Sequence, residues 1–254
     1  MTREKRGMVF AIKEGTKKTG AAKEKGKEIS MGVREFQISD RNVVIHELDD
    51  LYDSTTGRVL TGSWVWNSAF VLAEWMATQC KLFDFDIRDK TVIELGAGVG
   101  LPGLMAALLG ARRVVLTDVE PLLPGLLRNV DANGLVDRVQ VRELVWGLDE
   151  SVSRANELGE FDLILMSDLF YDSEDMAPLA HVLKIISGKN SKIWAASEIR
   201  PWTVECLKEF MNEGFKVEES QVQLDEPREE DDDHAILDLF SIFHLQPPDE
   251  ERNS

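Results

Sequence analysis

Residues 91–103 combine one carboxylate and several glycines in a spacing that suits a nucleotide-like cofactor. The segment reads Thr-Val-Ile-Glu-Leu-Gly-Ala-Gly-Val-Gly-Leu-Pro-Gly. A β-branched apolar run ends at Glu94, glycines follow, and an apolar helical pattern begins at once. Glycine has no Cβ and accepts positive φ, so the backbone can pass close to a ligand there. The first amides of the next helix are free to donate hydrogen bonds.

Two cofactor classes fit this loop, and a plain strand-to-helix turn is the structural alternative. The spacing G-x-G-x-x-G at 98–103, with Asp118 about 20 residues further on, satisfies the dinucleotide fingerprint. The spacing E-x-G-x-G-x-G at 94–100 instead places a carboxylate before the first glycine. A carboxylate suits a cofactor with a cationic amino-acid end, such as S-adenosylmethionine, and does nothing for a pyrophosphate.

A second group of polar residues follows a later apolar run. Residues 161–167 are strand-like, and Asp168 and Tyr171 come directly after them, three residues apart. Ligands of an open α/β sheet gather at the carboxyl ends of its strands, so both side chains can face the same cleft as the glycines. The structural alternative is a helix cap for Asp168 and a buried ring for Tyr171.

Two further strand ends carry candidate cofactor contacts. Asp118 ends a Val-Leu-Thr-Asp run, where a carboxylate can accept both ribose hydroxyls of either cofactor class, or else cap the helix that starts near Pro121. Trp146 lies in the loop 143–147 after the next run. Its ring can pack on an adenine face, with ordinary core packing as the alternative.

Strand and helix signals alternate strictly from residue 91 to residue 213. The strand-like runs are 91–95, 113–117, 138–143, 161–167 and 192–197, and the helical stretches are 101–109, 121–133, 173–187 and 202–213. Such alternation implies βαβ units and a parallel, doubly wound α/β sheet.

The C-terminal part breaks the alternation. Residues 215–224 and 235–245 are both strand-like, and an acidic loop at 225–233 joins them without a helix. Two strands in direct succession predict an antiparallel hairpin. Five parallel strands and this hairpin make a Rossmann-like seven-strand sheet. A dinucleotide dehydrogenase would normally need a second domain, for which this chain has no room.

The charge is unevenly distributed along the chain. Residues 1–28 hold nine Lys and Arg against four Glu, a net charge of +5. Because the whole chain has a net charge of −17, the remaining residues carry −22. Because apolar positions are few, we expect residues 1–30 to form a mostly disordered basic arm. The acidic body argues against nucleic acid as the main partner and is compatible with a lysine-bearing protein surface. Acidity that merely keeps the protein in solution is the alternative.

The rest of the chain predicts one domain over 31–247 and a polar tail at 248–254. Residues 33–48 alternate loosely as short strands, and residues 63–76 place apolar side chains at helical spacing. The inward candidates of the short strands are Phe36, Ile38, Val43 and Ile45. A chain of 254 residues with 43% hydrophobic content suits one α/β domain.

Composition argues against several other classes of protein. No apolar run approaches the roughly 18 residues that span a bilayer, and no apolar stretch of a secretory signal is found. Cys80 and Cys206 lie far apart and the four His are scattered, so we expect neither a disulfide framework nor a metal site. These features suit a cytoplasmic monomer, and the basic arm could serve as a nuclear address.

The motifs together resemble the seven-strand, class I methyltransferases, and within them the protein-lysine methyltransferases often called family 16. The resemblance runs from about Trp64 to Phe243. It is carried by the glycine motif, by Asp-Leu-Phe-Tyr at 168–171, by Val-Trp-Asn-Ser-Ala at 65–69 and by Leu-Val-Trp-Gly at 144–147. The order and spacing of four separate motifs make this resemblance specific.

The resemblance implies S-adenosylmethionine as cofactor and a protein side chain as methyl acceptor, the lysine ε-amine of a non-histone protein first of all. The residues that it assigns to the cofactor are Trp66, Gly96, Ala97, Gly98, Asp118, Trp146 and Ser167. The carboxylate of Glu94 joins them by the argument from charge. Asp168 and Tyr171 would line the acceptor site as its catalytic residues, and Phe170 would help Tyr171 flank the lysine stem.

Two alternatives stay open. Ser-Asp-Leu-Phe at 167–170 and Leu-Pro-Gly at 101–103 also resemble a relative proposed to modify histone arginine. A noncatalytic scaffold that binds the cofactor and recruits partners through its charged segments is the second alternative.

Overall fold

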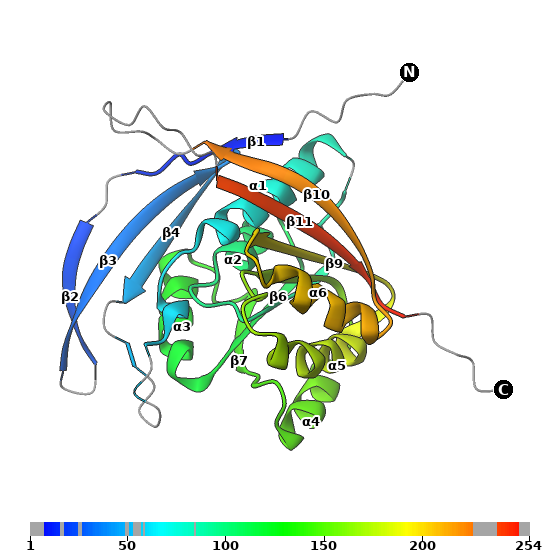
Figure 1. Cartoon of the computed structure of the whole chain (residues 1–254). Helices are drawn as coiled ribbons and strands as arrows, with labels where there is room; N and C mark the ends of the chain where they lie inside the picture. Colours follow the sequence, from blue (N-terminus) through cyan, green and yellow to red (C-terminus); the bar gives the residue numbers. More distant parts are fainter. Residues whose placement is uncertain are drawn as a thin grey trace.

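The computed structural model describes residues 8–15, 18–24, 27–48, 51–52, 57, 59–83, 85–225 and 238–248. They form an eight-stranded sheet with helices on both faces, and a separate three-stranded sheet at one side of the molecule (Figure 1).

The strands of the large sheet are β1 (Met8–Ala11), β5 (Thr91–Leu95), β6 (Arg113–Asp118), β7 (Val139–Glu143), β8 (Phe161–Ser167), β9 (Ser187–Glu198), β10 (Lys216–Asp225) and β11 (Asp238–Gln246). The small sheet holds β2 (Lys18–Glu24), β3 (Lys27–Ile38) and β4 (Arg41–Leu48). The helices are α1 (Asn67–Leu82), α2 (Leu101–Leu108), α3 (Leu123–Ala132), α4 (Asp149–Leu158), α5 (Met176–Ile186) and α6 (Thr203–Asn212). Short 3-10 turns are η1 (Thr61–Ser63), η2 (Glu120–Leu122) and η3 (Ser173–Asp175).

Seven strands of the large sheet confirm the predicted topology. The strand order is β1-β10-β11-β9-β8-β5-β6-β7. Strands β5 to β9 pair in parallel, and the terminal hairpin of β10 and β11 is antiparallel, with β11 against β9. The connections diverge at β5, which lies between β6 and β8, so this is the switch point at which open α/β sheets bind ligands.

The core consists of two layers, one on each face of this sheet. On β5, Val92 packs in the layer with α1, α2 and α3, while Ile93 and Leu95 pack in the layer with α4, α5 and α6. All three side chains are buried. Strands buried on both faces are rich in apolar residues, which is why residues 91–95 and 161–167 could be recognised in the sequence.

The prediction of a mostly disordered arm over residues 1–30 is wrong for its described part. β1 pairs in parallel with β10, and β2 pairs antiparallel with the first half of β3. Composition missed β1 because its partner lies about two hundred residues away along the chain and offers an open sheet edge. Phe10 of β1 is buried in the core. Residues 1–7 lie outside the described residues, as do 226–233 of the acidic loop, the following residues 234–237, and 249–254 of the tail.

Helix α4 was also missing from the sequence prediction. Its ten residues are mostly polar, and only Ser151 and Ala155 are buried. A helix that buries so little has almost no apolar stripe from which it could be recognised. The helix expected within 63–76 begins at Asn67, and Trp66 precedes it as its N-cap residue.

The three-stranded sheet is attached to α3 by two asparagines. The buried Asn129 accepts the His46 N–H through Oδ1 (2.8 Å) and donates through Nδ2 to the Val99 carbonyl (3.0 Å). Asn133, one turn later, exchanges two hydrogen bonds of 2.9 and 2.7 Å with the backbone of Val44. These amides pair with backbone groups of β4 much as a neighbouring strand would. The inward candidates of 33–48, Phe36, Ile38, Val43 and Ile45, are all buried as predicted.

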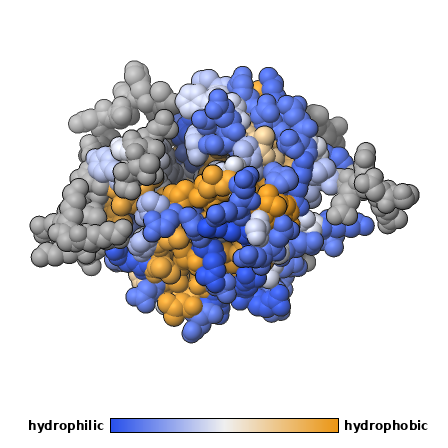
Figure 2. Space-filling view, turned by 90° about the horizontal axis from the view of Figure 1, so that it is seen from below, coloured by the Kyte–Doolittle hydropathy of each residue, from blue (hydrophilic) through white to orange (hydrophobic). Residues whose placement is uncertain are grey.

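The surface mixes apolar and polar areas. On the face seen from below, apolar side chains gather toward the middle between polar ones (Figure 2). In the part of the chain that the structure describes, no helix is both long and apolar enough to cross a membrane.

Replacing Asn129 should destabilise the fold. Asn129→Ala leaves the buried His46 N–H and Val99 carbonyl without partners, and we expect a loss of about 2–4 kcal/mol in the free energy of unfolding. Urea unfolding followed by circular dichroism measures it. Asn156→Ala is the matched control, because the exposed Asn156 on α4 bonds only to the Val152 carbonyl of the same helix. Equal stability of the two variants would contradict this role for Asn129.

Candidate functional site

A cavity of about 560 Å³ lies at the carboxyl ends of the central strands. Its walls are the segments that follow β5, β6, β7 and β8, and segment 59–66 before α1 covers one side. Nine of the ten predicted site residues line it: Trp66, Gly96, Ala97, Gly98, Asp118, Trp146, Ser167, Asp168 and Tyr171. The prediction that the strand ends converge on one cleft is therefore confirmed.

The glycine loop is confined by its own neighbours. Gly98 has a φ of +55°, and a Cβ there would lie 2.8 Å from the carbonyl oxygen of Gly62. The Ala97 N–H donates to the Thr117 carbonyl at 2.9 Å, which ties the loop to the end of β6. Any side chain at position 98 would push segment 59–66 away from the loop. The loop therefore needs glycine before any ligand is considered.

Asp118 holds the loop from the neighbouring strand. Its Oδ2 accepts the Gly98 N–H and its Oδ1 accepts the Val119 N–H, both at 2.7 Å. The structure gives α3 no side-chain cap, so the helix-cap alternative for Asp118 does not hold. Burial raises the pKa of Asp118 to about 6. At neutral pH the carboxylate is ionised, fixed in place and directed at the cavity with lone pairs to spare.

Glu94 is the one predicted site residue that does not reach the cavity. It is fully buried, and its Oε2 accepts the Gly103 N–H at 2.8 Å, a free donor in the first turn of α2. A Cβ at Gly103 would come within 2.2 Å of a Leu116 methyl group and 2.8 Å of this oxygen. Burial raises the pKa of Glu94 well above its usual value. The interpretation of Glu94 as a direct partner of a cationic cofactor is therefore wrong: Glu94 stabilises the strand-to-helix turn.

We expect Glu94→Gln to fold and to keep the cofactor site, because an amide oxygen can still accept the Gly103 N–H. The free energy of unfolding should fall by about 1 kcal/mol in this variant. It should fall by about 2–4 kcal/mol in Glu94→Ala, because that change leaves the Gly103 N–H without an acceptor and opens a cavity. Thermal denaturation compares the two variants. A folded Glu94→Gln protein that binds S-adenosylhomocysteine more than tenfold weaker would restore a charge-based role in cofactor binding.

Two tryptophans from different segments line the cavity. Trp66 is 40% exposed, and its Nε1–H donates to the Thr61 carbonyl at 3.0 Å. Trp146 is half-buried beside Gly96, and among the described residues its Nε1–H has no hydrogen-bond partner. Trp146 packs against the core and also lines the cavity, so both interpretations of this ring describe part of its surroundings.

Asp168 and Tyr171 occupy the turn after β8. Asp168 has a φ of +56°, which is uncommon for a residue with a side chain, and its N–H donates to the Ala196 carbonyl at 2.9 Å. Burial raises the pKa of Asp168, while the nearby Arg200 guanidinium opposes that rise. Backbone strain of this kind tends to collect at functional sites. The turn directs the Asp168 side chain toward the end of β9.

Tyr171 is half exposed at the cavity, whereas its neighbour Phe170 is not. Partial burial, together with Asp175 and Asp118, raises the pKa of Tyr171 to about 12, so its hydroxyl stays protonated. Phe170 is 1% exposed and packs edge-on against Phe210 and Phe243. The expectation that Phe170 flanks a substrate is therefore wrong, because its ring belongs to the core beneath α6.

Sequence reasoning missed two parts of this cavity. Arg200 lines it from just beyond β9, at hydrogen-bond distance from Asp168 (3.1 Å). It could have been found in the sequence, because it follows the fifth strand-like run, 192–197, and ligands gather at the carboxyl ends of such strands. Segment 59–64, with Gly62 against the glycine loop, also lines the cavity. No residue pattern marked it, because its position depends on tertiary packing.

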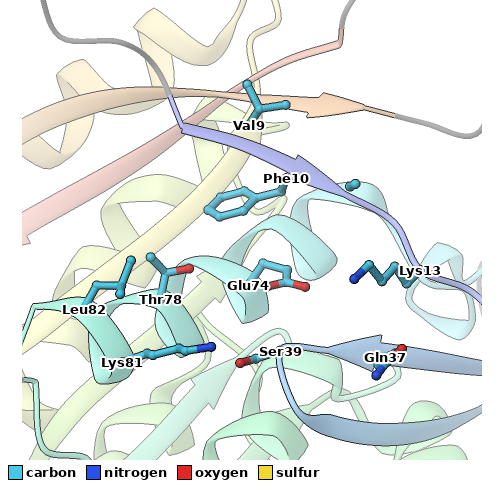
Figure 3. A pocket seen from close by; sticks show the side chains of 10 residues that line it. Val9, Phe10, Lys13, Gln37, Ser39, Glu74, Thr78, Lys81 and Leu82 are labelled. Atoms are coloured by element: carbon cyan, nitrogen blue, oxygen red, sulfur yellow. The ribbon is translucent and has the colours of Figure 1, made fainter.

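A second cavity of about 410 Å³ lies at the far end of α1 (Figure 3). Phe10 of β1, Ser39 of the β3–β4 turn, and Glu74 and Lys81 of α1 line it. Burial raises the pKa of Glu74. This cavity touches neither the glycine loop nor the carboxyl ends of β5 to β8, so the larger cavity is the candidate site. Within the described residues, no group of three or more His, Cys, Asp or Glu could hold a metal ion.

The fold and the site together define a class I, S-adenosylmethionine-dependent methyltransferase. The solved structure of the S-adenosylmethionine-dependent methyltransferase from Agrobacterium tumefaciens has this fold. It matches 98% of this chain and 98% of its own, with a TM-score of 0.54 and 16% identity.

Sequence comparison then gives the family. The lysine methyltransferase family matches residues 49–215. The chain belongs to this family. It is 37% identical to the protein N-lysine methyltransferase METTL21A of Danio rerio over 158 residues, which is 61% of this chain and 69% of the relative. It is 33% identical to the histone-arginine methyltransferase METTL23 of Xenopus laevis over 153 residues, which is 58% of this chain and 62% of the relative.

The residues of the larger cavity fit S-adenosylmethionine, the methyl donor of this class. A cavity of about 560 Å³ has the usual size for such a ligand. The Asp118 carboxylate can accept the ribose hydroxyls, Trp146 and Trp66 offer faces for the adenine, and the backbone at 96–98 allows close approach. Ser167 completes the wall beside Asp168. The family match favours S-adenosylmethionine over the dinucleotide interpretation of the glycine loop.

Cofactor affinity should depend on pH through Asp118. Hydroxyl donors prefer the ionised carboxylate, so the affinity for S-adenosylhomocysteine should be full above the pKa of about 6 and fall as the pH drops below it. Asp118→Asn should bind about tenfold more weakly at pH 7.5, roughly 1.4 kcal/mol, and show little change between pH 5 and 8. Isothermal titration calorimetry at each pH measures this. A wild-type affinity that is flat down to pH 5 would contradict it.

Proposed function

We propose that the protein transfers a methyl group from S-adenosylmethionine to the lysine ε-amine of a non-histone protein. The observation that carries the proposal is the position of Asp168 and Tyr171. They share one cavity with the glycine loop, and both lie on the turn after β8, a different segment from Asp118 at the end of β6. The cavity thus has one side for a donor and another for an acceptor.

The acceptor side favours lysine over arginine. A guanidinium acceptor is always charged and is best held by free carboxylates in a two-point contact. Here the Asp168 carboxylate is already bonded to Arg200. The family match and the METTL21A relative also support lysine, whereas the METTL23 relative supports the arginine alternative.

The acceptor amine must reach the cavity without its proton. Free lysine has a pKa near 10.4, so most of it is an ammonium at neutral pH. Desolvation lowers that pKa, and the half-exposed Tyr171, which lines the cavity, can shield the amine from water. Asp168 can accept a hydrogen bond from the amine and aim its lone pair, acting as an orienting acceptor and not as a strong base.

Most of the rate acceleration would come from positioning. When bound, S-adenosylmethionine supplies an electrophilic methyl group. The chain holds the acceptor nitrogen in line with it, so that a bimolecular reaction becomes effectively unimolecular. Transfer of the methyl group to the neutral amine gives a methylammonium group, and this group then loses one proton to solvent. No side chain needs to form a covalent bond.

The charge of the chain indicates what it binds. The residues outside 1–28 carry −22, which complements a basic, lysine-bearing protein surface. The proposal places the protein in the cytoplasm and also in the nucleus, as a monomer. Cell fractionation and light scattering would test these two points.

Labelled S-adenosylmethionine and a cell lysate provide the direct test. The purified protein should label one or a few discrete protein bands, and mass spectrometry of those bands should place the methyl group on lysine. Methylated arginine would support the alternative acceptor. Tight S-adenosylhomocysteine binding without any labelled protein would favour a noncatalytic scaffold.

Substitutions on the acceptor side should separate transfer from cofactor binding. Asp168→Asn or Tyr171→Phe should lower the transfer rate by at least about tenfold while the Kd for S-adenosylhomocysteine stays within threefold, because neither side chain lies on the donor side. Initial rates and calorimetry measure the two effects. Asp131→Asn, at an exposed position on α3, is the control. Full transfer rates in both folded variants would refute the acceptor role.

A further inference from the structure

Arg200 is the cavity residue that the proposed function leaves unexplained. Its Nη2 lies 3.1 Å from Asp168 Oδ2 and 3.0 Å from Glu198 Oε2, and its Nε lies 3.2 Å from the same Glu198 oxygen. The side chains of Arg200 and Asp168 are 19% and 11% exposed. A pair so shielded from water interacts more strongly than a surface ion pair.

The position of Arg200 is fixed from several directions. Its backbone N–H donates to Thr203 Oγ1 at 3.1 Å, at the start of α6. Its guanidinium carbon lies 5.9 Å from the centre of the Trp66 ring, within range of a cation–π contact. One side chain thus connects the ends of β8 and β9 with the segment before α1. Such an anchored group can hold a neighbouring carboxylate still.

The charges around Asp168 are mostly negative. Glu198 accepts from the same Arg200 Nη2 as Asp168 does, while Asp175 and Asp118 line the same cavity, and Ser197 Oγ lies 3.5 Å from Asp168 Oδ1. Among the described lining residues, Arg200 is the basic one. Without it, an incoming lysine would meet an uncompensated group of carboxylates.

We infer that Arg200 is a positioning residue of the acceptor site: it orients the Asp168 carboxylate and offsets its charge, so that the site receives a neutral amine. The inference rests on the proposed lysine acceptor. An unpaired carboxylate would raise the pKa of a bound lysine and keep it protonated, hence unreactive. A carboxylate that already holds a guanidinium can still accept a hydrogen bond from the amine with its remaining lone pairs.

The pH profile of methyl transfer tests the charge effect. With the acceptor protein found by labelling, Arg200→Gln should move the pH of half-maximal rate up by about one unit and lower the rate at pH 7.5 about tenfold. The rate should recover at higher pH, and Arg200→Lys should stay close to wild type. Arg88→Gln is the matched control, because Arg88 makes a two-bond ion pair with Asp86 outside the cavity. Its profile should equal that of wild type.

Glu198→Gln provides a second variant, for which we expect the pH of half-maximal rate to shift in the opposite direction. It removes one carboxylate from the same cluster while Arg200 remains, so the pH of half-maximal rate should move down. This variant keeps the inference testable if Arg200→Gln does not fold. A shift in the upward direction would count against the inference.

A carbon-13 NMR titration of the Asp168 carboxyl needs no acceptor protein. Its pKa should rise in Arg200→Gln and stay near the wild-type value in Arg200→Lys, while the Kd for S-adenosylhomocysteine stays within threefold. An unchanged Asp168 titration, a rate that falls equally at every pH, or a loss of cofactor binding in the folded variant would overturn the inference. A wild-type protein that labels nothing would instead overturn the proposed function, and the NMR result would still stand.

Discussion

A buried carboxyl group joins the end of β5 to the start of α2, and the glycine loop at the larger cavity is arranged around that junction. Glu94 accepts the Gly103 N–H in an environment with no exposed surface, while Gly103 lets α2 touch both Glu94 and β6. In the loop between them, Gly98 lies directly against the backbone of Gly62. The path of the loop is thus a result of strand–helix packing.

The side of the cavity that we propose for the acceptor is built on different elements and meets the glycine loop through strand order. β8 lies directly beside β5, so the turn that follows β8 opens into the same cavity. The hydrogen bond from the Asp168 N–H to the Ala196 carbonyl ties this turn to β9. Arg200, just beyond β9, donates a hydrogen bond to the Asp168 carboxylate. The glycine loop and the turn after β8 are thus held by separate sets of contacts, although they line the same cavity.

Much of the fold could be predicted because its central strands are buried on both faces. Residues 91–95 and 161–167 are rich in apolar side chains, and the strict alternation with helices implied the parallel sheet, while two strands in direct succession implied the hairpin. Helix α4 was invisible because it buries only two side chains. Strand β1 was missed because it belongs to the sheet only through an edge pairing with β10.

The sequence by itself determined the class of fold, the family and nine residues that line one cavity, because those features depend on local patterns: periodicity, glycine spacing and the residues that end each strand. Only the tertiary structure decided that Glu94 stabilises a turn, that Phe170 belongs to the core and that Arg200 holds Asp168. Which way a side chain points depends on burial and on neighbours distant in the chain. Those contacts exist only once the sheet has brought its strand ends together.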